Sequence, residues 1–188
     1  MPDRLRLGRI AYTNVAPLET AFDAGVVRRD VELVSGVPTQ LNAAMDAGDL
    51  DVSPMSAAHY LAHADRYVRV GNLGIVARGD VLSVVLASPV PPSLLGGADI
   101  AVAGDSASGR ALLQALLRTR YDVRARLVTV PDALGAAVAG HPTLLIGDAA
   151  IDATERLAPE AVHDLGRAWH DWTGLPMVFA LWAARREV

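Results

Sequence analysis

The sequence contains no cysteine in its 188 residues. Disulfide bonds, thiolate metal sites and cysteine nucleophiles are therefore excluded. Basic residues are not in excess either, because 17 Lys and Arg stand against 21 Asp and Glu and give a formal charge of −4. Neither a nucleic acid nor an anionic membrane is expected as a partner, since no basic field exists to attract one.

Several other signals are missing. No apolar run reaches the roughly 18 residues of a membrane span, and the N-terminus Met1-Pro2-Asp3-Arg4 has no signal-peptide pattern, so a cytoplasmic protein is expected. The H-E-x-x-H, Walker, G-x-G-x-x-G and G-x-S-x-G motifs are absent. His59 and His63 have helical spacing but no third ligand, which favours a partly exposed helix face over a metal site.

The first half of the chain alternates short apolar runs with amphipathic segments, within a composition that is 52% hydrophobic. Strands are predicted at 5–12, 31–35, 50–55 and 67–77, with helices between them at 15–25, 38–47 and 56–64. This order predicts a mostly parallel sheet with helices on its faces. Asp49 and Asp51 flank a turn and are expected to be solvated.

The pattern restarts after the polar break Arg78-Gly79-Asp80. Strands are predicted at 81–88, 99–103, 125–130, 143–147 and 177–184, and helices at 107–120, 131–139 and 148–156. We therefore predict two α/β lobes, residues 1–80 and residues 81–188, the second including a return strand. Ligands bind outside the carboxyl ends of strands in open parallel sheets, so the site is expected in a cleft between the lobes.

Small polar residues stand at several predicted strand-to-helix junctions. These junctions hold Tyr12-Thr13-Asn14, Ser56, the stretch Ser106-Ala107-Ser108, and Asp148. A helix N-terminus offers unpaired N–H groups and the positive end of its dipole, and so favours anions. Any one junction is explained by ordinary helix capping. The whole set, directed at one cleft, indicates a site for a small anion with more than one charge.

Six segments carry a resemblance to a known family. They are "GRIAYTNVAPL" (8–18), "VELVSGVPTQLNAAMDAGDLDVSPMSAAHY" (31–60), "SVVLAS" (83–88), "DSASGRALLQALLRTRY" (105–121), "LLIGDAA" (144–150) and "DLGRAWHDWTGLPMVFALWA" (164–183). In this order they resemble the chorismate dehydratases of the futalosine route to menaquinone. The resemblance implies a two-lobed, type II periplasmic-binding-protein-like fold in a cytoplasmic enzyme. It also implies conversion of chorismate to 3-[(1-carboxyvinyl)oxy]benzoate, without metal or cofactor.

The resemblance also assigns candidate site residues. Asn14 is expected to orient the substrate by hydrogen bonds, and Ser83 is expected to contact it from the other side. The residues expected to bind the dicarboxylate are Tyr12, Ser56, Ser106, Ala107, Ser108 and Asp148. The substrate's own enolpyruvyl carboxylate is the expected base. Asp148 is the rival base, and its structural interpretation is the N-cap of the helix that follows.

Two alternatives stay open from the sequence. One is a non-catalytic protein of the same fold that binds a small anion. The other is the sister enzyme that makes dihydroxynaphthoate, which typically opens with a Cys-Pro-Asn-Asp-Thr-like motif where this chain has "YTNVAP" (12–17). Family members normally continue well past "VFALWA" (178–183), so this chain is expected to lack the usual C-terminal segment.

Overall fold

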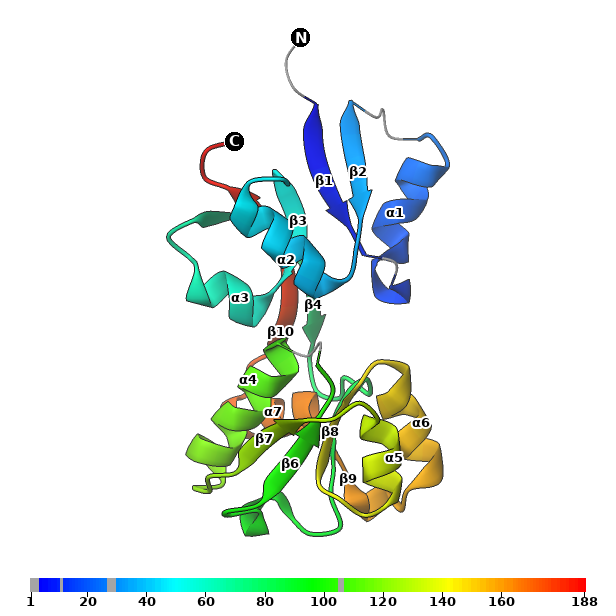
Figure 1. The fold of residues 1–188 in the computed structure, drawn as a ribbon, viewed down its shortest axis with the longest axis vertical. Helices are drawn as coiled ribbons and strands as arrows, with labels where there is room; N and C mark the ends of the chain where they lie inside the picture. The colour runs from blue at the N-terminus through cyan, green and yellow to red at the C-terminus, as the bar shows by residue number, and fades with distance from the viewer. Residues whose placement is uncertain (1–3, 11, 27–29, 105–106) are drawn as a thin grey trace. The chain divides into compact units, whose positions relative to one another are not determined.

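The computed structural model describes residues 4–10, 12–26, 30–104 and 107–188. The chain divides into two compact units, each with its own sheet (Figure 1). Unit 1 runs to Ile75 and also includes Val178–Val188, whereas unit 2 comprises Val76–Met177. The chain therefore passes from one unit to the other twice, within β4 (Tyr67–Ala77) and within β10 (Met177–Arg185).

Unit 1 is built around a five-stranded sheet in its described part. Besides β4 and β10, its elements are β1 (Leu5–Arg9), η1 (Thr13–Val15), α1 (Ala16–Asp23), β2 (Val31–Ser35), α2 (Pro38–Ala47), β3 (Val52–Ser56) and α3 (Ala57–Ala62). The strand order is β2-β1-β3-β10-β4. Strands β2, β1 and β3 run parallel, and β10 runs antiparallel to β3 with Ala180 opposite Ser56.

The core of unit 1 forms between this sheet and α2. Its buried residues are Ile10, Leu41, Met45, Leu50, Met55, Tyr67, Leu181 and Ala183. Leu41 and Met45 are one helical turn apart on α2, so both point at the sheet. Leu181 and Ala183 alternate along β10 and face the same side, which means that the strand returning from unit 2 completes this core.

Unit 2 is built around a second five-stranded sheet in its described part. Its elements are β5 (Val84–Ala87), η2 (Pro92–Leu94), β6 (Asp99–Val102), α4 (Ala107–Ala115), the π-helical turn η3 (Leu116–Arg120), β7 (Arg126–Thr129), α5 (Ala133–Val138), β8 (Thr143–Ile146), α6 (Asp148–Arg156), η4 (Pro159–Ala161), β9 (Val162–Asp164) and α7 (Leu165–Thr173). The strand order is β7-β6-β8-β5-β9. Strands β7, β6 and β8 are parallel, and β5 is antiparallel to both of its neighbours.

The core of unit 2 includes residues from β5 and β8 packed against α5 and α6. Its buried members include Val85, Ala87, Ala133, Ala137, Leu145, Ala150 and Ala153. The helix contributions are alanines, whose small side chains let the helices approach the strands closely. This packing places the start of α6 at the end of β8, where Asp148 lies.

Three differences from the predicted elements concern long-range pairing or a missed helix. The sheets are mixed, where mostly parallel ones were expected, because β10 inserts between β3 and β4 and because β5 runs against β8. The strand predicted at 177–184 was grouped with the second lobe, whereas Val178–Val188 makes its contacts in unit 1. Helix α7 was not predicted, although Asp164 caps its start and Gly174 ends it in the left-handed region, with φ of 71°.

Within the described ranges, no helix is both long enough and apolar enough to cross a membrane.

Candidate functional site

One edge of the unit 1 sheet collects the candidate residues of that unit. Strands β1 and β3 are parallel, with Leu7 opposite Val52, so their carboxyl ends lie at the same edge. Tyr12 and Asn14 follow β1, and both side chains are exposed. Val15 is only 1% exposed and anchors the short η1 helix that carries Asn14. The arrangement presents an amide side chain to solvent on an anchored turn.

Ser56 ends β3 and caps α3. Its hydroxyl oxygen accepts a hydrogen bond from the backbone N–H of His59 at 3.2 Å. The N-cap predicted from the sequence is therefore confirmed. The hydroxyl proton is not used in this bond, because the oxygen acts as the acceptor. Ser56 can therefore still donate one hydrogen bond from this edge of the sheet.

The corresponding edge of the unit 2 sheet brings Ser83 and Asp148 together. Strand β5 pairs with β8 through Val84 and Ile146, and the backbone N–H of Gly147 donates to the Ser83 carbonyl at 2.8 Å. Asp148 is the next residue after Gly147. The Ser83 hydroxyl is half-buried, and its one described hydrogen bond is a long contact of 3.4 Å to the Val81 carbonyl. Ser83, just before β5, and Asp148, just after β8, therefore lie at the same edge of the sheet although they are far apart in the sequence.

Asp148 is not the N-cap of α6, so the structural role predicted for it is wrong. Gly147, with φ of 60°, is the N-cap of α6, and Asp148 is the first residue of the helix, with its carboxylate exposed. A left-handed backbone at the cap is readily adopted by glycine and disfavours other residues. The carboxylate of Asp148 therefore stands in the first turn, where it interacts favourably with the helix dipole.

The start of α4 lies after β6, which runs parallel to β8. Ala107 is exposed, and its only polar groups belong to the backbone, whereas the Ser108 side chain is buried. The first backbone N–H groups of a helix have no intrahelical partner. Position 107 can therefore offer a ligand its backbone rather than its side chain. Ser106, the third candidate at this junction, lies outside the described residues.

Asp164 is a site-adjacent residue that the sequence reasoning missed. It ends β9, pairs with Val85 across the sheet, and caps α7 through the N–H of Arg167 at 2.9 Å. Its carboxylate also accepts hydrogen bonds from the backbone N–H groups of Val81 and Leu82, immediately before Ser83. An aspartate directly before an amphipathic segment is a helix-capping signal, but the contact of Asp164 with residue 81 is not a local pattern.

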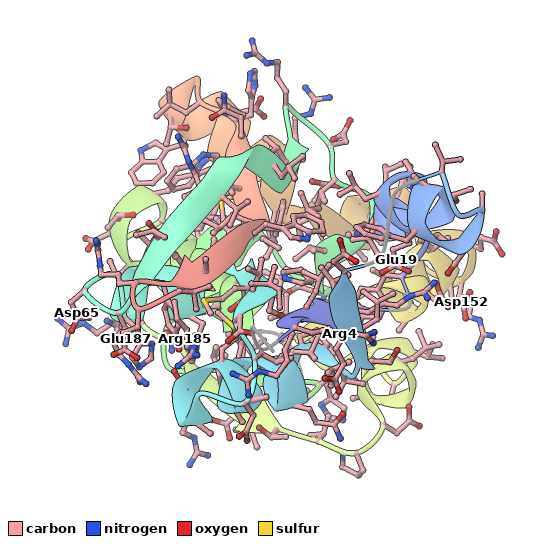
Figure 2. All side chains as sticks on the ribbon, turned by 90° about the horizontal axis from the view of Figure 1, so that it is seen from above. Arg4, Glu19, Asp65, Asp152, Arg185 and Glu187 are labelled. Carbon is pink, nitrogen blue, oxygen red and sulfur yellow. The ribbon has the colours of Figure 1, made fainter. Side chains whose placement is uncertain are left out.

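Asp51, expected to be solvated, is buried, and that prediction is wrong. Its carboxylate accepts hydrogen bonds from Arg6 at 2.8 Å and from Arg185 at 2.9 Å, and only 8% of the residue is exposed. The hydrogen bonds from the Arg6 guanidinium hold the pKa of Asp51 well below its usual range. Figure 2 shows Arg185 at the margin of unit 1 together with Glu187, its other partner at 3.6 Å.

The two histidines on or next to α3 belong to another polar cluster. His59 and His63 stack with ring centroids 4.3 Å apart, and His59 Nε2 lies 3.3 Å from Asp46. The Tyr67 hydroxyl donates to Asp46 at 2.5 Å. Burial acts to raise the pKa of Asp46, but the Tyr67 hydrogen bond and nearby positive charge outweigh it and lower that pKa. No group of three metal-ligating side chains occurs within the described ranges.

A hollow with a volume of about 460 Å³ adjoins this second cluster. It is lined by the end of α2, by residues 65–67 and by residues 185–187. The arginines among these residues already bind carboxylates or carbonyls, as Arg66 does with Asp46 and Arg186 with Asp65. Of the predicted substrate-binding residues that the structure describes, none lines this hollow.

Comparisons with known proteins agree on one family. A family model described as "Menaquinone biosynthesis" matches residues 5–188. A chorismate dehydratase from Thermus thermophilus is 33% identical over 202 aligned positions, which cover 96% of this chain and 70% of the relative.

Solved structures show the same fold. Protein AF1704 from Archaeoglobus fulgidus superposes with a TM-score of 0.71 at 23% identity, covering 98% of this chain and 69% of that chain. The periplasmic aliphatic sulphonate binding protein SsuA from Escherichia coli superposes with a TM-score of 0.65 at 18% identity, covering 100% of this chain and 63% of that chain. The predicted fold class, a type II periplasmic-binding-protein-like fold, is thereby confirmed.

Proposed function

Because the chain belongs to the menaquinone biosynthesis family, we propose that it is a chorismate dehydratase. The observation that carries this function is the 33% identity to the Thermus thermophilus enzyme over 96% of the chain. The family resemblance found in the sequence is confirmed by the same match. The reaction takes place in the cytoplasm in this family, and we place the protein there.

The reaction removes one water molecule from chorismate. A base takes the ring proton on the carbon that bears the enol ether, hydroxide leaves the neighbouring carbon, and the C–H electron pair becomes the new double bond. The product ring is aromatic, so the elimination is downhill and involves no change of oxidation state that would need a redox cofactor. The protein must hold a dicarboxylate in one pose and assist the departure of hydroxide, and alignment of reacting groups is worth about 7–11 kcal/mol.

In unit 1, the proposed orienting residue is Asn14. Its amide can donate and accept hydrogen bonds at once, which suits a substrate that carries a hydroxyl and two carboxylates. The amide is exposed on a turn whose neighbour Val15 is buried, so the turn is held while the side chain stays available. Tyr12 and Ser56 stand at the same sheet edge and supply further hydroxyl donors.

In unit 2, the proposed contact residue is Ser83. Its weak 3.4 Å hydrogen bond to Val81 leaves the hydroxyl free to be recruited by a ligand at little cost. The backbone N–H groups at the start of α4, around Ala107, are proposed to bind a substrate carboxylate, because a helix N-terminus favours an anion. Ser106 and Ser108 are still proposed to take part at this junction. Because the Ser108 side chain is buried, its contribution is expected from its backbone N–H in the first turn of α4.

The proposed base is the substrate's own enolpyruvyl carboxylate. It lies near the ring proton that must be lost, so an intramolecular transfer benefits from high effective concentration. Asp148 is the protein group best placed to replace it. The position of Asp148 in the first turn of α6 already explains an acidic residue there, because the helix dipole stabilises its charge.

Replacing Asp148 with asparagine is expected to leave kcat within about threefold of the wild-type value, since the change removes a helix-dipole interaction of about 0.5 kcal/mol and no catalytic base. The matched control is Asp152→Asn, four residues further along α6, which removes the same charge. Steady-state kinetics with chorismate measure both variants. Loss of turnover in Asp148→Asn alone, with unchanged substrate affinity, would make Asp148 the base.

The function itself is tested by incubating the chain with chorismate and following ultraviolet absorbance and product mass. The expected product is lighter than chorismate by one water and has an aromatic spectrum. If no product forms but chorismate raises the melting temperature, the protein is a binder of the same fold. If neither signal appears, the proposed function is wrong for this chain, and the sister activity is tested next.

A further inference from the structure

We propose that Asp164 is a positioning residue for the reaction, holding residues 81–83 so that the Ser83 hydroxyl stands where the substrate needs it. This inference rests on the proposed function of Ser83. Asp164 lies on β9, next to β5 in the sheet, and its carboxylate reaches across to the segment that leads into β5. All the contacts that carry the argument lie within unit 2.

The two carboxylate oxygens of Asp164 have different partners. Oδ1 accepts from the Arg167 N–H at 2.9 Å and so caps α7. Oδ2 accepts from the Leu82 N–H at 2.7 Å. The Val81 N–H is shared between them at 3.1 and 3.0 Å. One oxygen therefore serves mainly the helix and the other mainly the segment before Ser83, and hydrogen bonds to a charged acceptor are about twice as strong as neutral ones.

The segment needs such support because its backbone is strained. Leu82 has φ of 63°, in the left-handed region. This conformation costs a non-glycine residue about 1–2 kcal/mol. The Leu82 side chain is 63% exposed, so burial does not provide the compensation. The hydrogen bonds to Asp164 are the contacts that favour this backbone over a relaxed one.

Two further contacts join the start of α7 to the same segment. A Cβ added to Gly166 would stand 2.7 Å from the Gly79 carbonyl oxygen, so the helix and the segment touch through their backbones. Arg167 binds Asp80 through two parallel hydrogen bonds of 3.0 and 2.6 Å. The start of α7 therefore contacts residues 79–82 through Asp164, Gly166 and Arg167. Of these three, Asp164 is the one that bonds Leu82, the residue adjacent to Ser83.

Ser83 is therefore held from both sides. Its carbonyl accepts from Gly147 on the β8 side, and its N-terminal neighbour is bonded to Asp164 on the β9 side. If the Asp164 bonds are lost, Leu82 can relax toward an ordinary backbone conformation, and the rotation is passed directly to Ser83. A displacement of about 1 Å at a reacting group can lower a rate about 100-fold.

The test is Asp164→Asn. An asparagine caps a helix as well as an aspartate does, but the cap and the Leu82 bond use different oxygens of Asp164. The amide replaces one of these oxygens with an NH2 donor, so one of the two bonds is lost. We expect kcat/KM for chorismate to fall about 10- to 100-fold, mainly through kcat. Hydrogen exchange at the Leu82 amide should become faster. The matched control, Asp132→Asn, changes the cap of α5 in the same unit and should do neither.

A double mutant separates positioning from a general structural effect. In a Ser83→Ala background, Asp164→Asn should lower kcat/KM less than threefold, because the group that it positions is already gone. Equal losses in both backgrounds, or a wild-type kcat/KM in Asp164→Asn, would overturn the positioning role. Failure of the wild-type chain to convert chorismate is a different result, because it contradicts the proposed function before any variant is compared.

Discussion

Replacing Asn14 with alanine is expected to lower kcat/KM for chorismate by about 100-fold while leaving the melting temperature unchanged. The amide is exposed, so its removal creates no cavity, and the buried Val15 still anchors the η1 turn. The loss falls on the substrate, whose polar groups would lack the partner that orients them. Steady-state kinetics and a thermal melt of the same preparation measure the two quantities.

Two further variants sharpen this prediction. Asn14→Asp keeps the shape of the side chain but replaces its donor with a negative charge, so it should impair a dicarboxylate substrate at least as much as alanine does. Thr20→Ala, an exposed change on the following helix α1, is the matched control and should retain wild-type kinetics. Turnover in Asn14→Ala near the wild-type value, with the fold intact, would remove Asn14 from the site.

Replacing Asp51 with alanine is expected to lower the free energy of unfolding by about 3 kcal/mol. Its carboxylate is the shared partner of Arg6 on β1 and Arg185 on β10, so its loss removes the acceptor that joins two partly buried guanidinium groups. The backbones of the two segments are also hydrogen-bonded at this point, since the Arg185 N–H donates to the Asp51 carbonyl at 3.0 Å. Chemical denaturation measures the change, and the end of β10 should show the largest gain in hydrogen exchange.

The effect of Asp51 should depend on pH with a defined sign. Its pKa in the folded protein lies below the value of an unfolded aspartate, so its stabilisation is complete above about pH 5 and is lost as the pH falls through the folded pKa. The wild type and Asp51→Ala should therefore converge in acid. The control is Asp99→Ala, because the Asp99–Arg126 pair is exposed and contributes little. A loss in Asp51→Ala no larger than in Asp99→Ala would contradict the proposed role.

Local patterns in the sequence predicted the elements that local interactions decide. The predicted bounds of β2, α2, β4 and α6 match the structure to the residue. Each of these segments carries its own periodicity and its own start or stop, such as Pro38 in the first turn of α2 and Gly48, with φ of 84°, at its end. The family resemblance was also readable, because it depends on segments in order and requires no knowledge of their contacts.

The candidate site was predictable in part. The capping role of Ser56 followed from its place before an apolar run, and the structure confirms it. The neighbourhood of Ser83 and Gly147 was not predictable, because it depends on β5 pairing antiparallel to β8, whose paired residues are 56 to 62 positions apart in the sequence. The roles of Asn14 and Ser83 toward the substrate stay predictions that the kinetic experiments decide.

Only the tertiary structure decided where the long-range partners lie. The sequence by itself determined the alternation of strands and helices, the α/β class and the family, since all of these are recorded in local periodicity and motif order. It did not determine that β10 would lie between β3 and β4, or that Asp51 would be buried between Arg6 and Arg185. A charged residue beside a turn looks solvated until another strand brings it a partner, and strand pairing between distant segments leaves no periodic signal in either one.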